Sequence, residues 1–114
     1  MEIKTKEELD KVLKENDVVI VRVHAEWCGQ CKMLDRTISD IEKEAKTDAK
    51  FIGIDAEDAD ENLIMHLGVR NLPTIFYYKN GVVIDKTVGL ITEKDLIEKL
   101  NTIKNGRREK LRNG

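Results

Sequence analysis

Residues 18–32 read VVIVRVHAEWCGQCK, and this stretch decides the fold of the 114-residue chain. Its first six residues are almost all apolar and β-branched, which is typical of a central strand covered on both faces. After the cysteines, apolar residues recur at helical spacing through Glu44, which predicts a helix that begins near Cys28. The two cysteines, Cys28 and Cys31, therefore lie where a buried strand gives way to a helix.

Similar patterns predict the elements around this stretch. A capping box of Thr5 and Glu8 starts a helix, Asn-Gly joins two strands as a hairpin, and Thr92 caps a last helix. Strands separated by helices predict parallel pairing, and the hairpin predicts an antiparallel edge. The predicted fold class is α/β, with a central mixed sheet flanked by helices on both faces. The predicted helices are 6–15, 28–44, a short one ending at 68, and 92–105, and the other predicted strands are 51–55, 74–78 and 82–87, with a further short strand at 2–4.

Charge and composition narrow the function classes. The net charge is −2, which gives no reason to expect nucleic acid or an anionic membrane as the main partner. No run approaches the ~20 apolar residues of a membrane span. The first eight residues alternate in charge, unlike a secretory signal. We therefore expect a cytoplasmic monomer that binds neither nucleic acid nor membrane.

The charge is unevenly distributed along the chain. Residues 104–114 carry five positive charges against Glu109, which leaves −6 for residues 1–103. We therefore predict one domain over residues 1–103 and a flexible basic tail over residues 104–114. Such a tail can bind a polyanion, but a short charged terminus is more often a solvated extension, and that is the interpretation we favour.

The cysteine spacing favours redox chemistry. Unpaired backbone N–H groups and the positive end of the helix dipole favour the thiolate of Cys28, and two intervening residues bring Cys31 within bonding reach. A zinc site needs about four ligands, and this chain adds only His24 and His66, which do not form a second pair. We expect no metal, and we interpret His66 as a helix-surface residue.

Two separate motifs resemble the thioredoxin family. The run AEWCGQCKM, residues 25–33, is similar to the family's active-site segment, which usually reads AEWCGPCKM. The run VRNLPT, residues 69–74, resembles the family's cis-proline loop, and Val88-Gly89 fits a later landmark. Element order and spacing agree from about residue 5 to residue 103. The resemblance implies a thioredoxin fold and a thiol-disulfide oxidoreductase acting on protein disulfides.

The resemblance also implies a role for individual residues. Cys28 attacks the substrate disulfide and the more buried Cys31 resolves the mixed disulfide. Trp27 shields the thiolate and contacts substrate, Pro73 is cis, and the backbone of Leu72 hydrogen-bonds the substrate. No bound cofactor is implied, and the electrons come from a donor of the thioredoxin-reductase kind. The remaining residues that shape the site are Gly29, Gln30 and Gly89.

Three positions depart from the family pattern. Gln30 replaces a proline and restores a backbone N–H at the helix start, which predicts a less reducing potential than about −270 mV. Arg22 stands where the family has a buried Asp, and Phe51 stands where that Asp commonly has a Lys neighbour. The guanidinium either points toward the site and stabilises thiolates or reaches solvent and supplies only packing.

Without the family's buried Asp, proton transfer to Cys31 would need water, Glu26 or His24. His24 shares a strand face with Arg22 and lies four residues before Cys28. We favour a strand-end histidine that is hydrogen-bonded to its neighbours, because proximity to a motif does not make a catalytic base. The stripe of Met33, Leu34 and Ile38 is interpreted as core packing.

A second function remains open at this point. A binding or regulatory module can keep the scaffold and use its cysteines little, since fold does not fix function. The departures at Arg22, Gln30 and Phe51 favour it, whereas the presence of both cysteines together with Trp27 and Pro73 favours redox chemistry. Reduction of insulin disulfides distinguishes the two.

Overall fold

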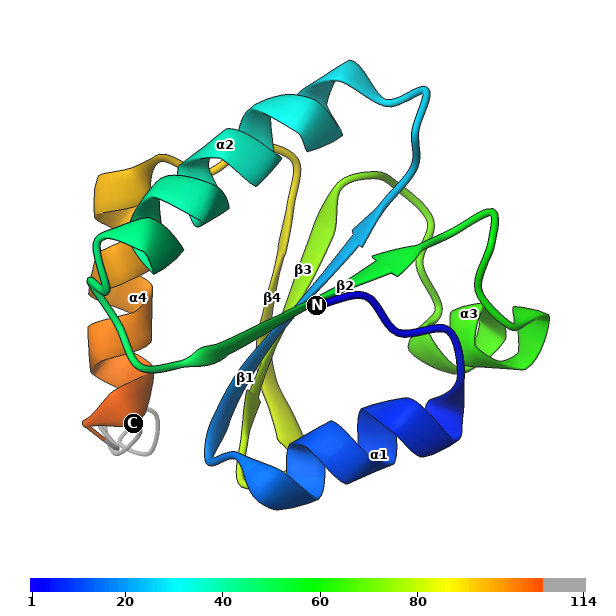
Figure 1. Ribbon diagram of the computed structural model, residues 1–114, viewed down its shortest axis with the longest axis horizontal. Helices are drawn as coiled ribbons and strands as arrows, with labels where there is room; N and C mark the ends of the chain where they lie inside the picture. Colours follow the sequence, from blue (N-terminus) through cyan, green and yellow to red (C-terminus); the bar gives the residue numbers. More distant parts are fainter. Residues whose placement is uncertain (106–114) are drawn as a thin grey trace.

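The computed structural model describes residues 1–105, in which four helices and four strands follow the predicted order (Figure 1). The predicted flexible tail lies outside the described residues except for its first two positions. The boundary at residue 103 stays a prediction, although Lys104 still belongs to the last helix and pairs with Asp48 at 3.0 Å. The elements are α1 (Lys6–Glu15), β1 (Val18–His24), α2 (Gly29–Lys43), β2 (Lys50–Asp55), α3 (Glu61–Leu67), β3 (Thr74–Lys79), β4 (Val82–Val88) and α4 (Glu93–Lys104).

The four strands form one mixed sheet in the order β2-β1-β3-β4. β1 and β2 are parallel, and β3 and β4 form the predicted antiparallel hairpin. β3 is also antiparallel to β1, so the prediction that helix-separated strands pair in parallel was wrong here. The connection through α3 does not carry the chain back along the sheet, since a seven-residue helix spans about 10 Å and a six-residue strand about 20 Å.

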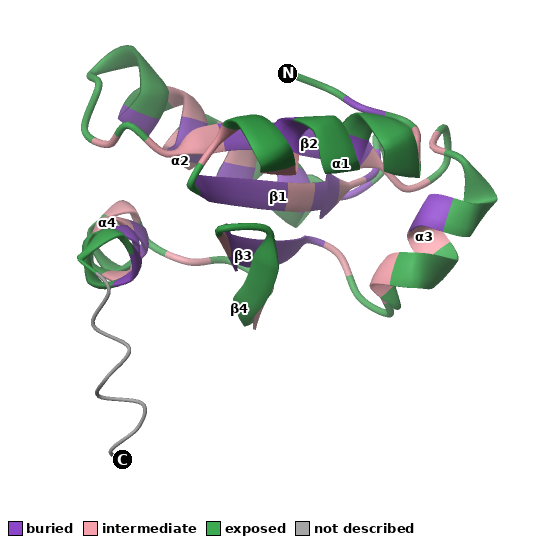
Figure 2. Ribbon diagram, turned by 90° about the horizontal axis from the view of Figure 1, so that it is seen from below, coloured by how far each residue is buried: buried purple, intermediate pink, exposed green. Residues whose placement is uncertain are grey.

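The sheet separates two apolar layers. α1 and α3 cover one face and α2 and α4 cover the other (Figures 1 and 2). Alternate residues of β1 point into each layer: Val19, Val21 and Val23 pack with α1 and α3, whereas Val18 and Ile20 pack with α2 and α4. This double burial confirms β1 as the predicted central strand.

Local signals at the helix ends act as the sequence predicts. Thr5 and Glu8 form a reciprocal capping box on α1, and the Thr92 hydroxyl accepts a hydrogen bond from the Asp95 N–H at 3.1 Å. Gly68 ends α3 with a φ of 67°, a left-handed conformation that glycine adopts without strain. Each cap satisfies backbone groups that a helix end leaves free.

Two details differ from the expected pattern. Met33 is 54% exposed while Leu34 and Ile38 are buried, so its assignment to the core was wrong. Residues 34, 38 and 41 follow one face of α2, and Met33 projects about 100° away from that face. The predicted strand at residues 2–4 is a single bridge between Glu2 and Gly53, which places the N-terminus beside β2.

Candidate active site

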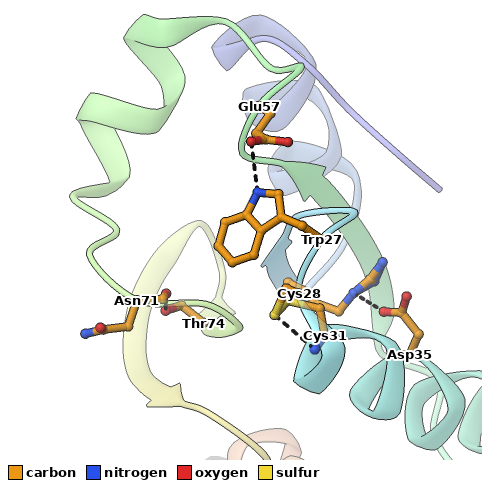
Figure 3. The surroundings of a disulfide bond; sticks show 8 residues. Trp27, Cys28, Cys31, Asp35, Glu57, Asn71 and Thr74 are labelled. Atoms are coloured by element: carbon orange, nitrogen blue, oxygen red, sulfur yellow. Dashed lines mark hydrogen bonds and ion pairs between the residues drawn. A yellow bond between two sulfur atoms is a disulfide. The ribbon is translucent and has the colours of Figure 1, made fainter.

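The two cysteines lie at the start of α2, where they form a disulfide (Figure 3). Cys28 is the N-cap residue and Cys31 lies in the first turn, with 5.2 Å between their Cα atoms. Cys28 is 6% exposed and Cys31 only 1%. Cys31 is thus the more buried of the two, as the resemblance implied.

The start of α2 stabilises a negative charge on the Cys28 sulfur. The Cys31 N–H donates to Cys28 Sγ at 3.2 Å. The first turn of α2 contains no acidic residue. A thiolate at Cys28 therefore receives a backbone hydrogen bond and the positive end of the helix dipole, and no carboxylate in the first turn of α2 opposes it.

The loop that contains Pro73 lies against the cysteines. The Leu72–Pro73 peptide bond is cis, and Leu72 packs against Ala25, Cys28 and Cys31. The Thr74 hydroxyl donates to the Asn71 carbonyl at 2.6 Å, and the Gly89 N–H donates to the Pro73 carbonyl at 2.8 Å. Hydrogen bonds at both ends thus fix this loop beside the disulfide.

Trp27 is the most exposed aromatic residue near the disulfide, with 68% of its surface accessible. Its indole Nε1 donates to Glu57 Oε2 at 2.9 Å, in the turn after β2 (Figure 3). Glu57 was not among the site residues predicted from the sequence. The available signal was an acidic segment directly after β2, because the carboxyl ends of parallel strands lie at one edge of the sheet.

Arg22 belongs to a charged cluster on the α2 side of the sheet. Its Nε lies 2.7 Å from Asp35 Oδ1, as an ion pair rather than an aligned hydrogen bond, and its Nη2 lies 3.4 Å from Glu2 Oε2. The side chain is 14% exposed and its guanidinium forms two ion pairs, so Arg22 supplies more than packing. Arg22 joins β1 to α2 one helical turn beyond Cys31.

His24 shares this cluster. Its Nε2 lies 2.9 Å from Glu2 Oε1, which agrees with a strand-end histidine hydrogen-bonded to a neighbour. Glu2 reaches both residues because Gly53 leaves room for it: a Cβ there would overlap the Glu2 carboxylate and lie 3.0 Å from Arg22 Nη2. Neither Glu2 nor Asp35 was predicted from the sequence, since only the fold places the N-terminus and α2 beside Arg22.

The other selected residues divide into two groups. Glu26, Gly29 and Gln30 are exposed around the disulfide, and a Cβ added to Gly29 would meet nothing within 4 Å beyond its chain neighbours and the backbone of its own helix. Phe51 is buried between the sheet and the layer formed by α2 and α4, and its phenyl ring cannot transfer protons. His66 is exposed on α3, as predicted.

Two kinds of feature are absent from the described residues. Residues 1–105 contain no group of three or more His, Cys, Asp or Glu side chains arranged to hold a metal ion. None of the helices in that range is both long enough and apolar enough to cross a bilayer.

Comparison with known proteins gives one consistent family. The family model described as Thioredoxin matches residues 1–102. The chain is 34% identical to a thioredoxin of Mycoplasmoides gallisepticum over 98 residues, covering 86% of this chain and 96% of that protein. It is 37% identical to a thioredoxin of Rickettsia felis, covering 80% of this chain and 86% of that protein.

Solved structures agree with the sequence matches. A mutant thioredoxin from Halobacterium salinarum superposes with a TM-score of 0.83 at 31% identity, covering 90% of this chain and 88% of that one. The fold and the Cys28–Cys31 pair support the same chemistry as the family match. The chain belongs to the thioredoxin family and is a thiol-disulfide oxidoreductase.

Proposed function

We propose that this chain reduces protein disulfides in the cytoplasm as a monomer, with Cys28 as the attacking thiolate. The observation that carries this assignment is the N-cap position of Cys28, which accepts the Cys31 N–H while Cys31 lies deeper. A donor of the thioredoxin-reductase kind would return the oxidised pair to the dithiol.

The reaction is two successive exchanges. The Cys28 thiolate attacks one sulfur of the substrate disulfide, and the other substrate sulfur leaves as a thiolate that takes a proton. The Cys31 thiolate then attacks Cys28 Sγ and displaces the second substrate thiolate. Two electrons pass from the dithiol to the substrate, and the chain ends as the Cys28–Cys31 disulfide that the structure contains.

The surrounding residues support binding of an extended substrate segment. Exposed Trp27 and the cis-proline loop lie on two sides of the disulfide (Figure 3). We assign Trp27 to shielding and substrate contact, and the backbone of Leu72 to hydrogen bonds with the substrate. Gly89 supports that loop through its bond to Pro73.

Single-cysteine variants test this assignment. Cys31→Ser leaves the attacking sulfur in place and should accumulate a mixed disulfide with a protein substrate, visible by non-reducing electrophoresis. Cys28→Ser should form none and should reduce insulin no faster than dithiothreitol alone. A binding module with idle cysteines predicts background rates for the unaltered chain as well, so that result would exclude the assignment.

We also predict that Gln30 changes the reduction potential of the Cys28–Cys31 pair. An added backbone N–H at the helix start favours the thiolate-bearing state, which predicts a potential above about −270 mV. Gln30→Pro should then make the pair more reducing when equilibrated against glutathione buffers. A reduction potential of the unaltered chain at or below about −270 mV would contradict this prediction.

A further inference from the structure

A small cavity borders the cis-proline loop. Its volume is about 130 Å³, enough for one side chain and too small for a nucleotide. The segment that follows α3, the start of β3 and the second half of β4 line it, and the lining includes Arg70, Asn71, Thr74 and Lys86.

Adjacent residues of the cis-proline loop border the cavity and the disulfide. Leu72 packs against Cys28 and Cys31, and its neighbour Asn71 lines the cavity. Figure 3 shows Asn71 and Thr74 in the surroundings of the disulfide. Because extended chain advances about 3.3 Å per residue, a substrate segment along this loop passes the cavity within a few residues of its reacting cysteine.

The cavity carries positive charge that residues 1–105 do not neutralise. Arg70 and Lys86 line it, and none of its described lining residues is acidic. Neither cation forms an ion pair with any residue of that range. Two cations that have no ion-pair partner within residues 1–105 thus lie at one small cavity, in a domain whose residues 1–103 carry a net charge of −6.

We propose that this cavity is a substrate subsite for a carboxylate side chain. Its occupant is an Asp or Glu of the protein substrate, a few residues from the disulfide under attack. The Arg70 guanidinium suits a carboxylate because it can donate two parallel hydrogen bonds, while Lys86 adds a compact charge. The Asn71 amide can donate a further hydrogen bond.

A charge of the opposite sign lies beside Trp27, where the Glu57 carboxylate accepts the indole N–H. An acidic substrate residue is therefore attracted at the cavity and repelled near Trp27, which favours one direction in which the segment crosses Cys28. This inference rests on the proposed function and names the substrate class for the same dithiol.

Paired peptides test the subsite. Each pair carries one intermolecular disulfide and differs only by Glu or Gln, placed one, two or three residues to either side of the cysteine. The measured quantity is the ratio of kcat/KM for Glu over Gln. The variants are Arg70→Gln/Lys86→Gln and a matched control, Lys11→Gln/Lys94→Gln, which removes two exposed charges from α1 and α4.

The unaltered chain should prefer the Glu peptide by about three- to tenfold at one or two positions, as expected for two exposed charge pairs. The preference should shrink with added salt, vanish in Arg70→Gln/Lys86→Gln and persist in the control. A ratio near one at every position, or a ratio unchanged by Arg70→Gln/Lys86→Gln, would overturn the subsite. If the subsite is overturned but the Gln peptides are still reduced, the proposed disulfide reductase function stands. If no peptide is reduced at all, both the subsite and the proposed function are excluded.

Discussion

Arg22 on β1 and Asp35 on α2 form an ion pair of 2.7 Å, and Asp35 lies four residues after Cys31. Residues at this spacing share one face of a helix, so the carboxylate and the resolving sulfur are neighbours along α2. The pair therefore joins the strand and the helix that meet at the disulfide. It also balances the charge that Asp35 would otherwise place near the dithiol.

Arg22→Gln should destabilise the fold by about 2 kcal/mol, between the values for surface and buried pairs. The substitution leaves a buried oxygen of Asp35 without its cation. Urea unfolding measures the loss. Arg22→Met/Asp35→Leu should recover part of it, because removing both charges leaves none uncompensated. Equal midpoints for Arg22→Gln and the unaltered chain would show that the pair contributes nothing.

The same substitution should make the dithiol more reducing. Without Arg22, the Asp35 charge disfavours a thiolate on the neighbouring cysteine, and the oxidised state gains relative weight. We expect about a threefold shift in the equilibrium with glutathione, and a shift of opposite sign for Asp35→Asn. Arg36→Gln, which removes an exposed charge one residue further along α2, is the control. Shifts of the same sign in all three variants would contradict this account.

Glu57→Gln should loosen Trp27. The charged carboxylate holds the indole N–H at 2.9 Å, and hydrogen bonds to charged groups are about twice as strong as neutral ones. Because Trp27 is the only tryptophan of the chain, its fluorescence anisotropy reports the change directly. Glu61→Gln removes a nearby exposed acid as control. Anisotropy that stays constant in Glu57→Gln would show that packing alone orients the indole.

Gly89→Ala should cost about 1 to 2 kcal/mol, because Gly89 has a φ of 86° where L side chains are strained. Its N–H also donates to Pro73, so the strain would act on the loop beside the disulfide. Gly29→Ala is the comparison, since an added Cβ there meets nothing beyond its chain neighbours and the backbone of its own helix, and alanine favours helix. Thermal unfolding in which both variants melt alike would exclude a special role for the Gly89 backbone.

The free energy of unfolding should fall at high pH because the buried Tyr77 hydroxyl resists ionisation in the folded state. Burial raises the pKa of Tyr77 to about 12, although its hydrogen bond with Thr87 acts in the other direction. A folded-state pKa above the unfolded value near 10 gives stability that is complete below pH 10 and is lost as the pH rises toward 12. Tyr77→Phe should make the urea-unfolding midpoint less dependent on pH between about 10 and 12. Parallel curves for the two proteins would disprove the linkage.

Much of the fold follows from local sequence. Caps at Thr5 and Thr92, the Asn-Gly turn and the apolar strand at residues 18–23 act within a few residues of themselves, so their outcomes are already present in the sequence pattern. The direction of β3 was missed because it depends on where an 18-residue connection crosses the sheet. Local periodicity holds no information on that crossing.

The site residues also divide into those that follow from local sequence and those that depend on long-range contacts. The sequence by itself determined the cysteine pair at a helix start, because the spacing of Cys28 and Cys31 within one helical turn brings the sulfurs together wherever that helix lies. Only the tertiary structure decided the partners of Arg22 and Trp27 and brought Arg70 and Lys86 to one cavity. These relationships join segments 13 to 30 residues apart, and they exist only once the sheet and both helix layers have assembled.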